Sequence, residues 1–373
     1  MFVVPPAAPV SPSVSSRAYT IRDLLRQTPA ASLYRADLMT TGGFCRPVAI
    51  KFLRGKAAHD ADELARLRDE ARLLGQLRHR AIVGALGLVQ LDGEWALVME
   101  EARGVSLEAL LSRGPLPPAV ALEVIEEVAS ALDAAWNLTN DGQPLRLVHR
   151  ALDGAAVYLT TDGGVRVVGF HCARADFAGR EAGTRMLARR GAPDSQGSDP
   201  AADIYALGTL LFAMIAGYSY PPAAGAARAH ATQLREALAT LPMHGAEAAG
   251  VRDLLEAMLA LQGPLRPGAR EVARRCERLR QGLSGPSLRA WAAQVVRAIP
   301  EPSPTTRDPR VGRAMREGPA PIAVTSVSHP EVGSRAQLIG LAVLLGGFAT
   351  GALVTGAGAL WLLAQVLPTL LGR

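Results

Sequence analysis

The order of the predicted elements constrains the fold of this chain more than any other feature. Four strand-like stretches lie within the first hundred residues, at 19–25, 32–37, 47–52 and 94–99. A helix predicted at 60–77 interrupts them, because apolar residues recur there at helical spacing. After Ser106 helices dominate, at 119–137, 201–216, 253–261 and 269–281. Strands followed by helices predict an α+β fold with a small sheet-rich lobe at 18–102 and a larger helical lobe at 103–283.

The composition indicates a globular chain and excludes several classes of protein. Lys and Arg total 40 against 34 Asp and Glu, but the arginines are spread along the chain. A nucleic-acid binder would gather them with aromatic residues, so no nucleic-acid partner is expected. Cys45, Cys172 and Cys276 lie too far apart for a zinc site or a disulfide framework, which suits a reducing compartment. Residues 1–17, rich in Pro and Ser, predict a disordered leader rather than a signal peptide.

The C-terminal part predicts a tether to a membrane. Residues 284–335 read as a short helix and a Pro/Arg-rich linker, in which an arginine recurs every third residue from Arg307 to Arg316. These arginines are expected to be solvated, with contact to anionic lipid as the alternative. No charged residue occurs from Ala336 to Gly372. Because a bilayer core needs about 20 apolar helical residues, we predict a transmembrane helix at 336–366 and a short tail at 367–373.

Two features suggest how this helix would sit in a membrane. Arg335 directly precedes it, and positive residues favour the cytoplasmic side, so the large N-terminal part is expected to face the cytoplasm from a single-pass anchor. Gly347 and Gly351 form a pair of small residues four apart, which lets two helices approach closely. The sequence therefore predicts localisation at the cytoplasmic membrane, with dimerisation through these glycines as a hypothesis.

A series of short motifs then appears in a fixed order. Val48-Ala49-Ile50-Lys51 ends a predicted strand, and Glu70 lies on the helix that follows it. The next strand reads Leu97-Val98-Met99-Glu100, and His149-Arg150 follows the long helix at 119–137. Four further motifs complete the series: Gly183-Thr184, Ala192-Pro193-Asp194, Asp203 to Gly208, and Arg266-Pro267. Together they span about residues 19–282 and resemble the protein kinase family, with the closest likeness to bacterial serine/threonine kinases of the eukaryotic type.

The resemblance implies a two-lobed kinase-like domain at 18–283 and gives roles to particular residues. A residual nucleotide site would consist of Lys51, Glu70, Met99 and Ala102. Structural roles would fall to His149, Phe170, Leu74, Asp203 and the pair of Asp194 with Arg266. Lys51 with Glu70 has two interpretations, a nucleotide-binding pair or an ion pair that only holds the helix against the small lobe. Tyr158 matches a position under the adenine ring, where a tyrosine could fill the pocket.

The chain departs from the family pattern where phosphoryl transfer needs it most. The stretch from Arg26 to Leu33, which matches the glycine-rich loop, has no glycine and contains Pro29. Ala151 stands at the position of the catalytic base, and Ala156 and Gly169 stand at those of the two metal ligands. No catalytic residue is therefore intact, and magnesium binding is not expected. Because phosphoryl transfer depends on positioning and charge neutralisation, transfer is not expected either. Asp153 or Asp176 could rebuild a metal site only in an unusual geometry.

The sequence thus leads to three hypotheses for function. The first is a membrane-anchored pseudokinase that acts as a signalling scaffold or allosteric partner of active kinases or their substrates, because anchoring raises the effective concentration of co-anchored proteins. The second is an atypical active serine/threonine kinase that transfers phosphate from ATP. The third is a nucleotide sensor that binds ATP without metal. No cofactor is required by the first hypothesis, and ATP is the ligand of the other two.

Overall fold

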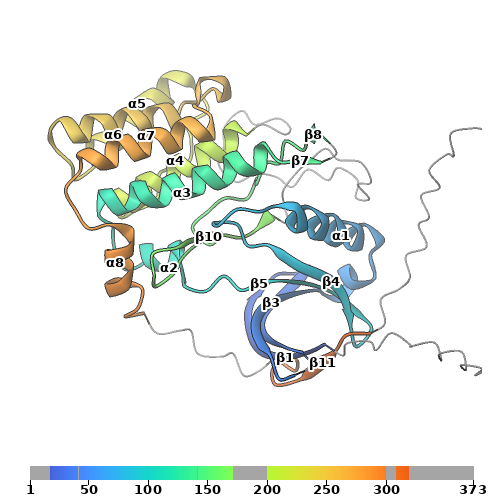
Figure 1. The fold of residues 1–373 in the computed structure, drawn as a ribbon. Coiled ribbons are helices and arrows are strands. Elements are labelled where there is room, and N and C mark those ends of the chain that lie inside the picture. The colour runs from blue at the N-terminus through green and yellow to red at the C-terminus, as the bar shows by residue number, and fades with distance from the viewer. Residues whose placement is uncertain (1–16, 41, 141, 171–199, 300–307, 319–373) are drawn as a thin grey trace, which may run out of the picture. The chain divides into compact units, whose positions relative to one another are not determined.

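The computed structural model describes residues 17–40, 42–140, 142–170, 200–299 and 308–318 (Figure 1). The chain divides into two units, 1–320 and 321–373, and only the first contains described residues. The predicted transmembrane helix, its glycine pair Gly347 and Gly351, and most of the leader lie outside the described residues. Within the part that is described, no helix is long and apolar enough to cross a bilayer.

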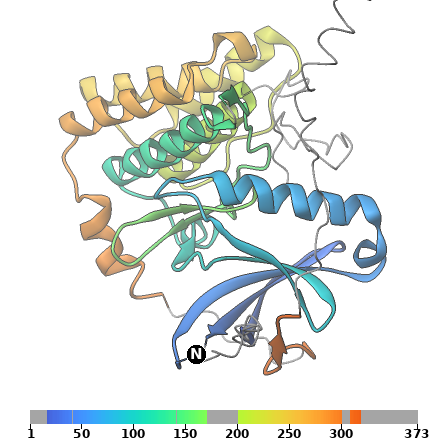
Figure 2. The same cartoon turned by 45° about the vertical axis from the view of Figure 1, so that its right-hand side comes forward.

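The first lobe is a twisted antiparallel sheet with one long helix. Its strands are β1 (Ala18–Gln27), β2 (Ala31–Met39), β3 (Cys45–Leu53), β4 (Ala85–Leu91) and β5 (Glu94–Glu100), and a later strand, β11 (Ala314–Arg316), completes the order β11-β1-β2-β3-β5-β4. The helix α1 (Ala61–Gln76) follows a 3-10 turn at Gly55–His59 and lies between the sheet and the second lobe (Figures 1 and 2). Asp60 caps α1 by accepting the amides of Asp62 and Glu63, which explains where this helix begins.

The second lobe is mainly helical. Its helices are α2 (Leu107–Leu111), α3 (Pro118–Trp136), α4 (Ala201–Ala216), α5 (Ala227–Ala239), α6 (Gly245–Met258), α7 (Ala269–Gly282) and α8 (Leu288–Val295). Short strands complete it: β6 (Val105–Ser106), β7 (Thr139–Asn140), β8 (Gln143–Pro144), β9 (Val157–Leu159) and β10 (Val165–Val167). The helix α4 packs closely on α6, because a Cβ added at Gly208 would lie 3.0 Å from the Cβ of Met258.

Buried apolar residues form two separate core clusters. The larger one fills the helical lobe and extends through Leu74, Leu97 and Met99 into the side of the sheet that faces α1. The smaller one lies inside the curl of the sheet and includes Tyr34 and Phe52. The predicted two-lobed α+β fold is therefore confirmed, with one cluster shared across the junction of the lobes.

One part of the linker prediction is wrong. The short helix expected after residue 284 is present as α8, but residues 308–318 are not a solvated linker. They include β11, which pairs with the start of β1, and Met315 is buried in the smaller cluster at 1% exposure. Arg310 contacts the ring faces of Phe52 and Tyr34 and forms an ion pair with Glu94 at 2.5 Å. Apolar Met315 and the stacked Arg310 give this segment a face that the sheet can bury.

Candidate functional site

A cleft of about 1780 Å³ opens between the two lobes. All four residues predicted to form the nucleotide site line it, since Lys51 and Met99 come from β3 and β5, Glu70 from α1, and Ala102 from the segment joining the lobes. Tyr158 on β9 and Gly169 after β10 also line the cleft. The structure therefore brings these four predicted residues together in one cleft.

Lys51 and Glu70 are in direct contact. The Lys51 Nζ lies 2.5 Å from Glu70 Oε2, and the two side chains are only 16% and 8% exposed. The strand β3 holds the lysine between β2 and β5, where Lys51 pairs with Leu33 on one side and Leu97 on the other. The pair thus ties α1 to the centre of the sheet and places a lysine ammonium, paired with a carboxylate, inside the cleft.

Replacing Lys51 by methionine is expected to lower the free energy of unfolding by about 2–4 kcal/mol, because it leaves the buried Glu70 carboxylate without a partner. The double variant Lys51→Met/Glu70→Leu should recover most of that loss. Denaturant unfolding of both variants would measure this difference, with the exposed Lys56→Met as the control, expected within about 0.5 kcal/mol of wild type. Equal losses in the single and double variants would contradict a structural role for the pair.

The roof of the cleft cannot cradle phosphate as a glycine-rich loop does. Thr28 and Ala31 close a tight turn in which the Thr28 amide donates to the Ala31 carbonyl at 2.8 Å, and the Ala31 amide donates to Thr28 Oγ1 at 3.0 Å. Pro29 has no amide hydrogen. Three of the four residues from Thr28 to Ala31 therefore offer no N–H to an anion, which is a stronger departure than the missing glycines alone.

The loop that follows the long helix α3 is held by one buried carboxylate. Asp203 on α4 accepts the amide of His149 at 2.7 Å and that of Arg150 at 2.8 Å. The buried His149 ring contacts the carbonyl of Val168 at 2.9 Å and packs edge-to-face on Phe170, with ring centroids 4.6 Å apart. Leu74 and Phe170 both belong to the larger cluster of buried apolar residues. Of the predicted structural residues, Leu74 and Phe170 thus line the cleft, and His149 and Asp203 hold the loop beside it. Ala151, which follows Arg150, leaves the base position without an ionisable group.

The positions of the two metal ligands have no oxygen donor. Ala156 is buried, and a Cβ added at Gly169 would lie 3.8 Å from the Ala156 Cβ. Gly169 also has φ +98°, a conformation that L-residues rarely adopt, so an aspartate there would be strained. Among the described residues no group of three His, Cys, Asp or Glu side chains could hold a metal ion. These residues do not fit magnesium as the family would bind it.

The remaining acidic candidates do not replace the lost ligands. Asp153 is exposed, and its Oδ1 accepts the amides of Ala155 and Ala156, both at 3.0 Å, so it stabilises the turn before β9. Asp176 lies outside the described residues, as do His171, Cys172 and the stretch from Gly183 to Asp194. The guanidinium of Arg266, predicted to pair with Asp194, donates to the carbonyls of Ala260, Ala201 and Leu261.

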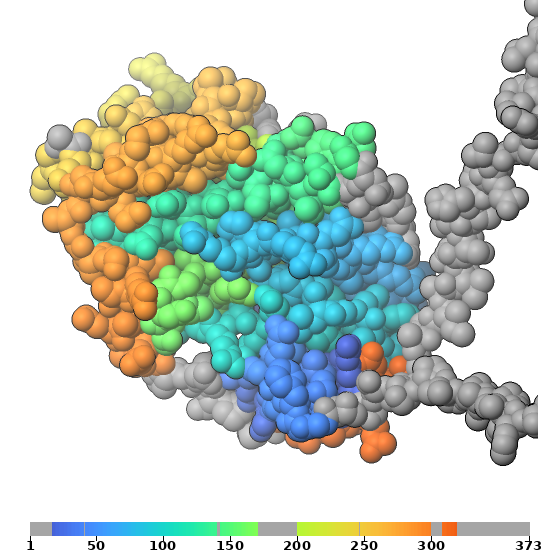
Figure 3. Space-filling model, in the orientation of Figure 1, coloured from blue at the N-terminus to red at the C-terminus, as the bar shows by residue number. Residues whose placement is uncertain are grey.

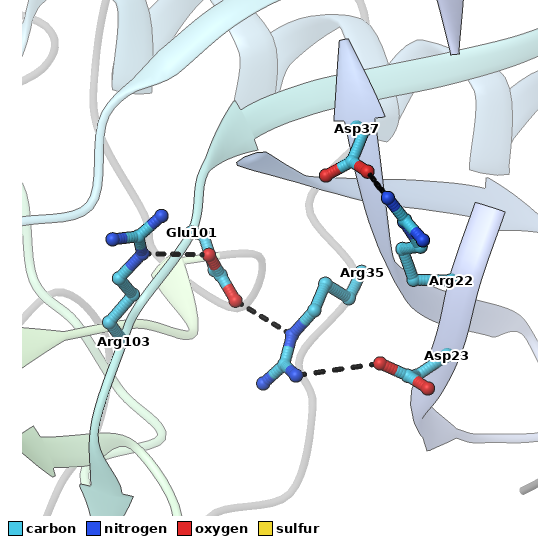
Figure 4. A network of polar contacts seen from close by, with 6 residues as sticks. All are labelled: Arg22, Asp23, Arg35, Asp37, Glu101 and Arg103. Carbon is cyan, nitrogen blue, oxygen red and sulfur yellow. Dashed lines mark hydrogen bonds and ion pairs between the residues drawn. The ribbon is translucent and has the colours of Figure 1, made fainter. Parts of the chain in front are cut away.

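An ion-pair network that the residue patterns do not predict lies at the cleft, where Arg35, Glu101 and Arg103 contribute to the lining. Glu101, only 8% exposed, receives Arg35 from β2 at 2.7 Å and Arg103 at 3.1 Å (Figure 4). Arg35 also reaches Asp23 on β1 at 3.4 Å. Figure 4 shows the separate pair of Arg22 with Asp37 nearby. The network connects β1 and β2 to the segment between the lobes. The pattern of charged residues along these strands does not indicate which of them form ion pairs.

The floor of the cleft contains a phenol rather than an aliphatic side chain. Tyr158 lies on β9 between its neighbours β6 and β10. Burial raises the pKa of Tyr158 above its usual value of 10.0, so the phenol is neutral at physiological pH. Tyr158 therefore contributes a neutral aromatic ring to the lining of the cleft.

Comparison with known proteins points to one family. A model of the protein kinase domain matches residues 39–275. Tyrosine-protein kinase MasK of Myxococcus xanthus is 33% identical over 208 residues, which are 52% of this chain and 32% of MasK. Serine/threonine-protein kinases of Mycobacterium tuberculosis are also similar: PknL is 31% identical over 47% of this chain and 44% of its own length, and PknA is 30% identical over 75% and 61%.

A solved structure supports the fold. The crystal structure of a double mutant of the Mycobacterium tuberculosis PknI kinase domain superposes with a TM-score of 0.51 at 20% identity, covering 72% of this chain and 99% of that domain. The chain spans between about a third and three fifths of the length of the curated relatives named above. Since the kinase-domain model matches more than half of the 373 residues and the two lobes are those of that fold, the chain belongs to the protein kinase family, with bacterial serine/threonine kinases among its relatives.

Proposed function

We propose that this chain is a catalytically inactive member of its family, a pseudokinase that acts as a signalling scaffold or allosteric partner. The observation that carries the proposal is the chemistry of three positions: Ala151, Ala156 and Gly169 supply neither a base nor a metal ligand. Around them the frame is intact, because Asp203 still holds the loop at His149. A framework kept without the reacting groups supports binding of proteins rather than phosphoryl transfer.

The partners and the location belong to the same proposal. Active kinases or their substrates are the proposed partners. The uncharged stretch 336–366 would anchor the chain to the cytoplasmic membrane as a single-pass protein. Anchoring would raise the effective concentration of the chain among proteins at the same surface. Association through Gly347 and Gly351 would bring two such chains together.

Two other functions remain as competing hypotheses, each with an observation in its favour. An atypical active kinase is favoured by the names of the relatives, which are kinases. A metal-independent nucleotide sensor is favoured by the open cleft and the charged Lys51 within it. Both require ATP to enter the cleft, whereas the scaffold does not.

Thermal unfolding of the full chain with ATP separates the three functions. A ligand present at about 100 times its Kd stabilises a protein by about 2.7 kcal/mol, or roughly 5 °C for a domain of this size. The scaffold is expected to show no shift with ATP, with or without magnesium. A shift that needs magnesium and is lost in Lys51→Ala would favour the active kinase, and a shift that persists in EDTA would favour the sensor.

A further inference from the structure

Residues 308–318 lie on the sheet lobe in the way that an extended peptide lies on a binding surface. The strand β11 pairs antiparallel with the first three residues of β1. Next to this ladder, the Ile21 amide donates to the Arg313 carbonyl and the Gly312 amide donates to the Ile21 carbonyl, both at 2.9 Å. Main-chain hydrogen bonds of this kind give affinity to an extended segment that is added at a sheet edge.

The same residues also reach the opposite edge of the sheet. The Gly318 amide donates to the Gln90 carbonyl of β4 at 2.9 Å, and Glu317 forms an antiparallel bridge with Leu91. Figure 1 shows β11 beside β1 on the curled sheet. Without this segment, β1 and β4 would both be edge strands, whose unpaired backbone groups are a template for pairing with another chain.

One side chain of the segment enters a site for a cation. The Arg310 guanidinium lies over the Phe52 ring, 4.6 Å from its centroid, and one of its nitrogens lies 2.5 Å from a carboxylate oxygen of Glu94. The Tyr34 hydroxyl donates to Asp308, two residues earlier in the segment, at 3.0 Å. An aromatic face beside a carboxylate binds a guanidinium well, because it offers both stacking and a charge-assisted hydrogen bond.

A second side chain of the segment fills an apolar site. Met315 is 1% exposed and belongs to the smaller cluster, together with Tyr19 and Leu91. Its neighbours Ala314 and Arg316 are exposed, because side chains alternate along a strand. The sheet lobe therefore holds β11 through its backbone and one buried side chain, so recognition depends little on the outer side chains.

We propose that the sheet lobe carries a peptide-binding groove, which residues 308–318 of the same chain occupy here. Its ligand is an extended peptide with an arginine and, five residues later, an unbranched apolar side chain. The space-filling view shows part of the segment, in orange, at the surface beside the blue strands (Figure 3). A partner protein that displays such a peptide would take the place of residues 308–318. The residues that form the groove, such as Phe52 and Glu94, do not line the interlobe cleft, so this inference holds whether or not the chain transfers phosphate.

The first test measures hydrogen–deuterium exchange of the full chain carrying Met315→Asp, with and without a free peptide of residues 308–318. A carboxylate is costly to bury in the apolar site, so the Ile21 amide is expected to exchange at least about tenfold faster, while α3 is unchanged. The free wild-type peptide, at roughly the millimolar effective concentration of a tethered segment, should slow exchange at Ile21 again. The same peptide carrying Met315→Asp should leave this exchange fast.

Any of three results would overturn the groove. They are fast exchange at Ile21 in the wild-type chain, slow exchange at Ile21 in the Met315→Asp chain, and fast exchange in that variant that the wild-type peptide does not slow. Arg313→Ala is the matched control, because this side chain is 59% exposed and the bond to Ile21 is made by the backbone carbonyl. The control is expected to exchange like the wild-type chain at Ile21.

A milder variant keeps the test decisive if Met315→Asp fails to fold. Arg310→Ala removes the contact with Phe52 and the ion pair with Glu94 but introduces no buried charge. The Ile21 amide is expected to exchange about threefold faster in this variant and to slow again with the wild-type peptide, whereas a peptide carrying Arg310→Ala should slow it less. The proposal fails if Ile21 exchanges in the folded Arg310→Ala chain as in the wild type, or if the wild-type peptide does not slow it.

Discussion

Replacing Asp203 by alanine is expected to lower the free energy of unfolding by about 3–5 kcal/mol, since it leaves two backbone N–H groups without an acceptor at about 1–3 kcal/mol each and removes further packing. The two amides belong to His149 and Arg150, and the carboxylate is 4% exposed. Arg150 has φ +69°, so its backbone is held in an unfavourable conformation by these bonds. Loss of the acceptor should therefore also allow the loop at His149 and Arg150 to leave this conformation.

Denaturant unfolding and calorimetry would measure this effect, with a Tm lowered by roughly 6–12 °C. Asp253→Ala is the matched control, because Asp253 is exposed on α6 and should change the stability by less than about 0.5 kcal/mol. Asp203→Asn should fall between wild type and alanine, since an amide keeps one acceptor oxygen but turns a donor toward the second N–H. If Asp203→Ala unfolds like the control, other contacts hold the loop at His149 and Arg150, and Asp203 is not what keeps its conformation.

The long helices were predictable from sequence because their apolar faces are continuous. The helices predicted at 60–77, 119–137 and 201–216 correspond to α1, α3 and α4 within one or two residues at each end. Their ends carry local signals: Asp60 caps α1, and Gly217, with φ +82°, ends α4 in the left-handed conformation. Periodicity and capping are local properties, so one sequence suffices to read them.

Elements without such local signals were missed or misplaced. The helix α5 was not predicted, and α6 begins at Gly245, eight residues before the predicted start, in a stretch of Gly and Ala with little periodicity. The strand β11 has only three residues, and it exists because β1, nearly three hundred residues away, supplies its partner. Pairing over such a distance depends on tertiary structure, which residue patterns near Met315 do not encode.

The contrast between local sequence signals and contacts made only in the folded chain also applies to the residues of the site. Lys51 and Glu70 were predicted as a pair because a motif fixes each residue on its own element, and the two side chains are in contact in the cleft. The network at Glu101 was not predicted, because Arg35 and Arg103 meet it only after β2 and the segment between the lobes come together. Likewise, no residue pattern indicated that Gly169 has a backbone conformation that disfavours aspartate.

Phosphoryl transfer by this chain is expected to be undetectable. A missing general base typically costs 10²–10⁴-fold, and removal of groups that stabilise charge in the transition state costs a further 10²–10³-fold for each donor. Here the base position is Ala151, the metal positions are Ala156 and Gly169, and the roof turn at Thr28–Ala31 uses its own amides. These losses act on separate parts of the reaction, so retaining Lys51 alone does not compensate for them.

The most direct test of the pseudokinase proposal is a phosphotransfer assay of the full chain with labelled ATP. It would be run with magnesium and with manganese, on the chain itself and on a general protein substrate, beside a Lys51→Ala variant. We expect the wild-type chain and Lys51→Ala to give the same background signal in every condition. Clear transfer by the wild-type chain that disappears in Lys51→Ala would contradict the pseudokinase proposal and identify an active kinase with rebuilt metal ligands.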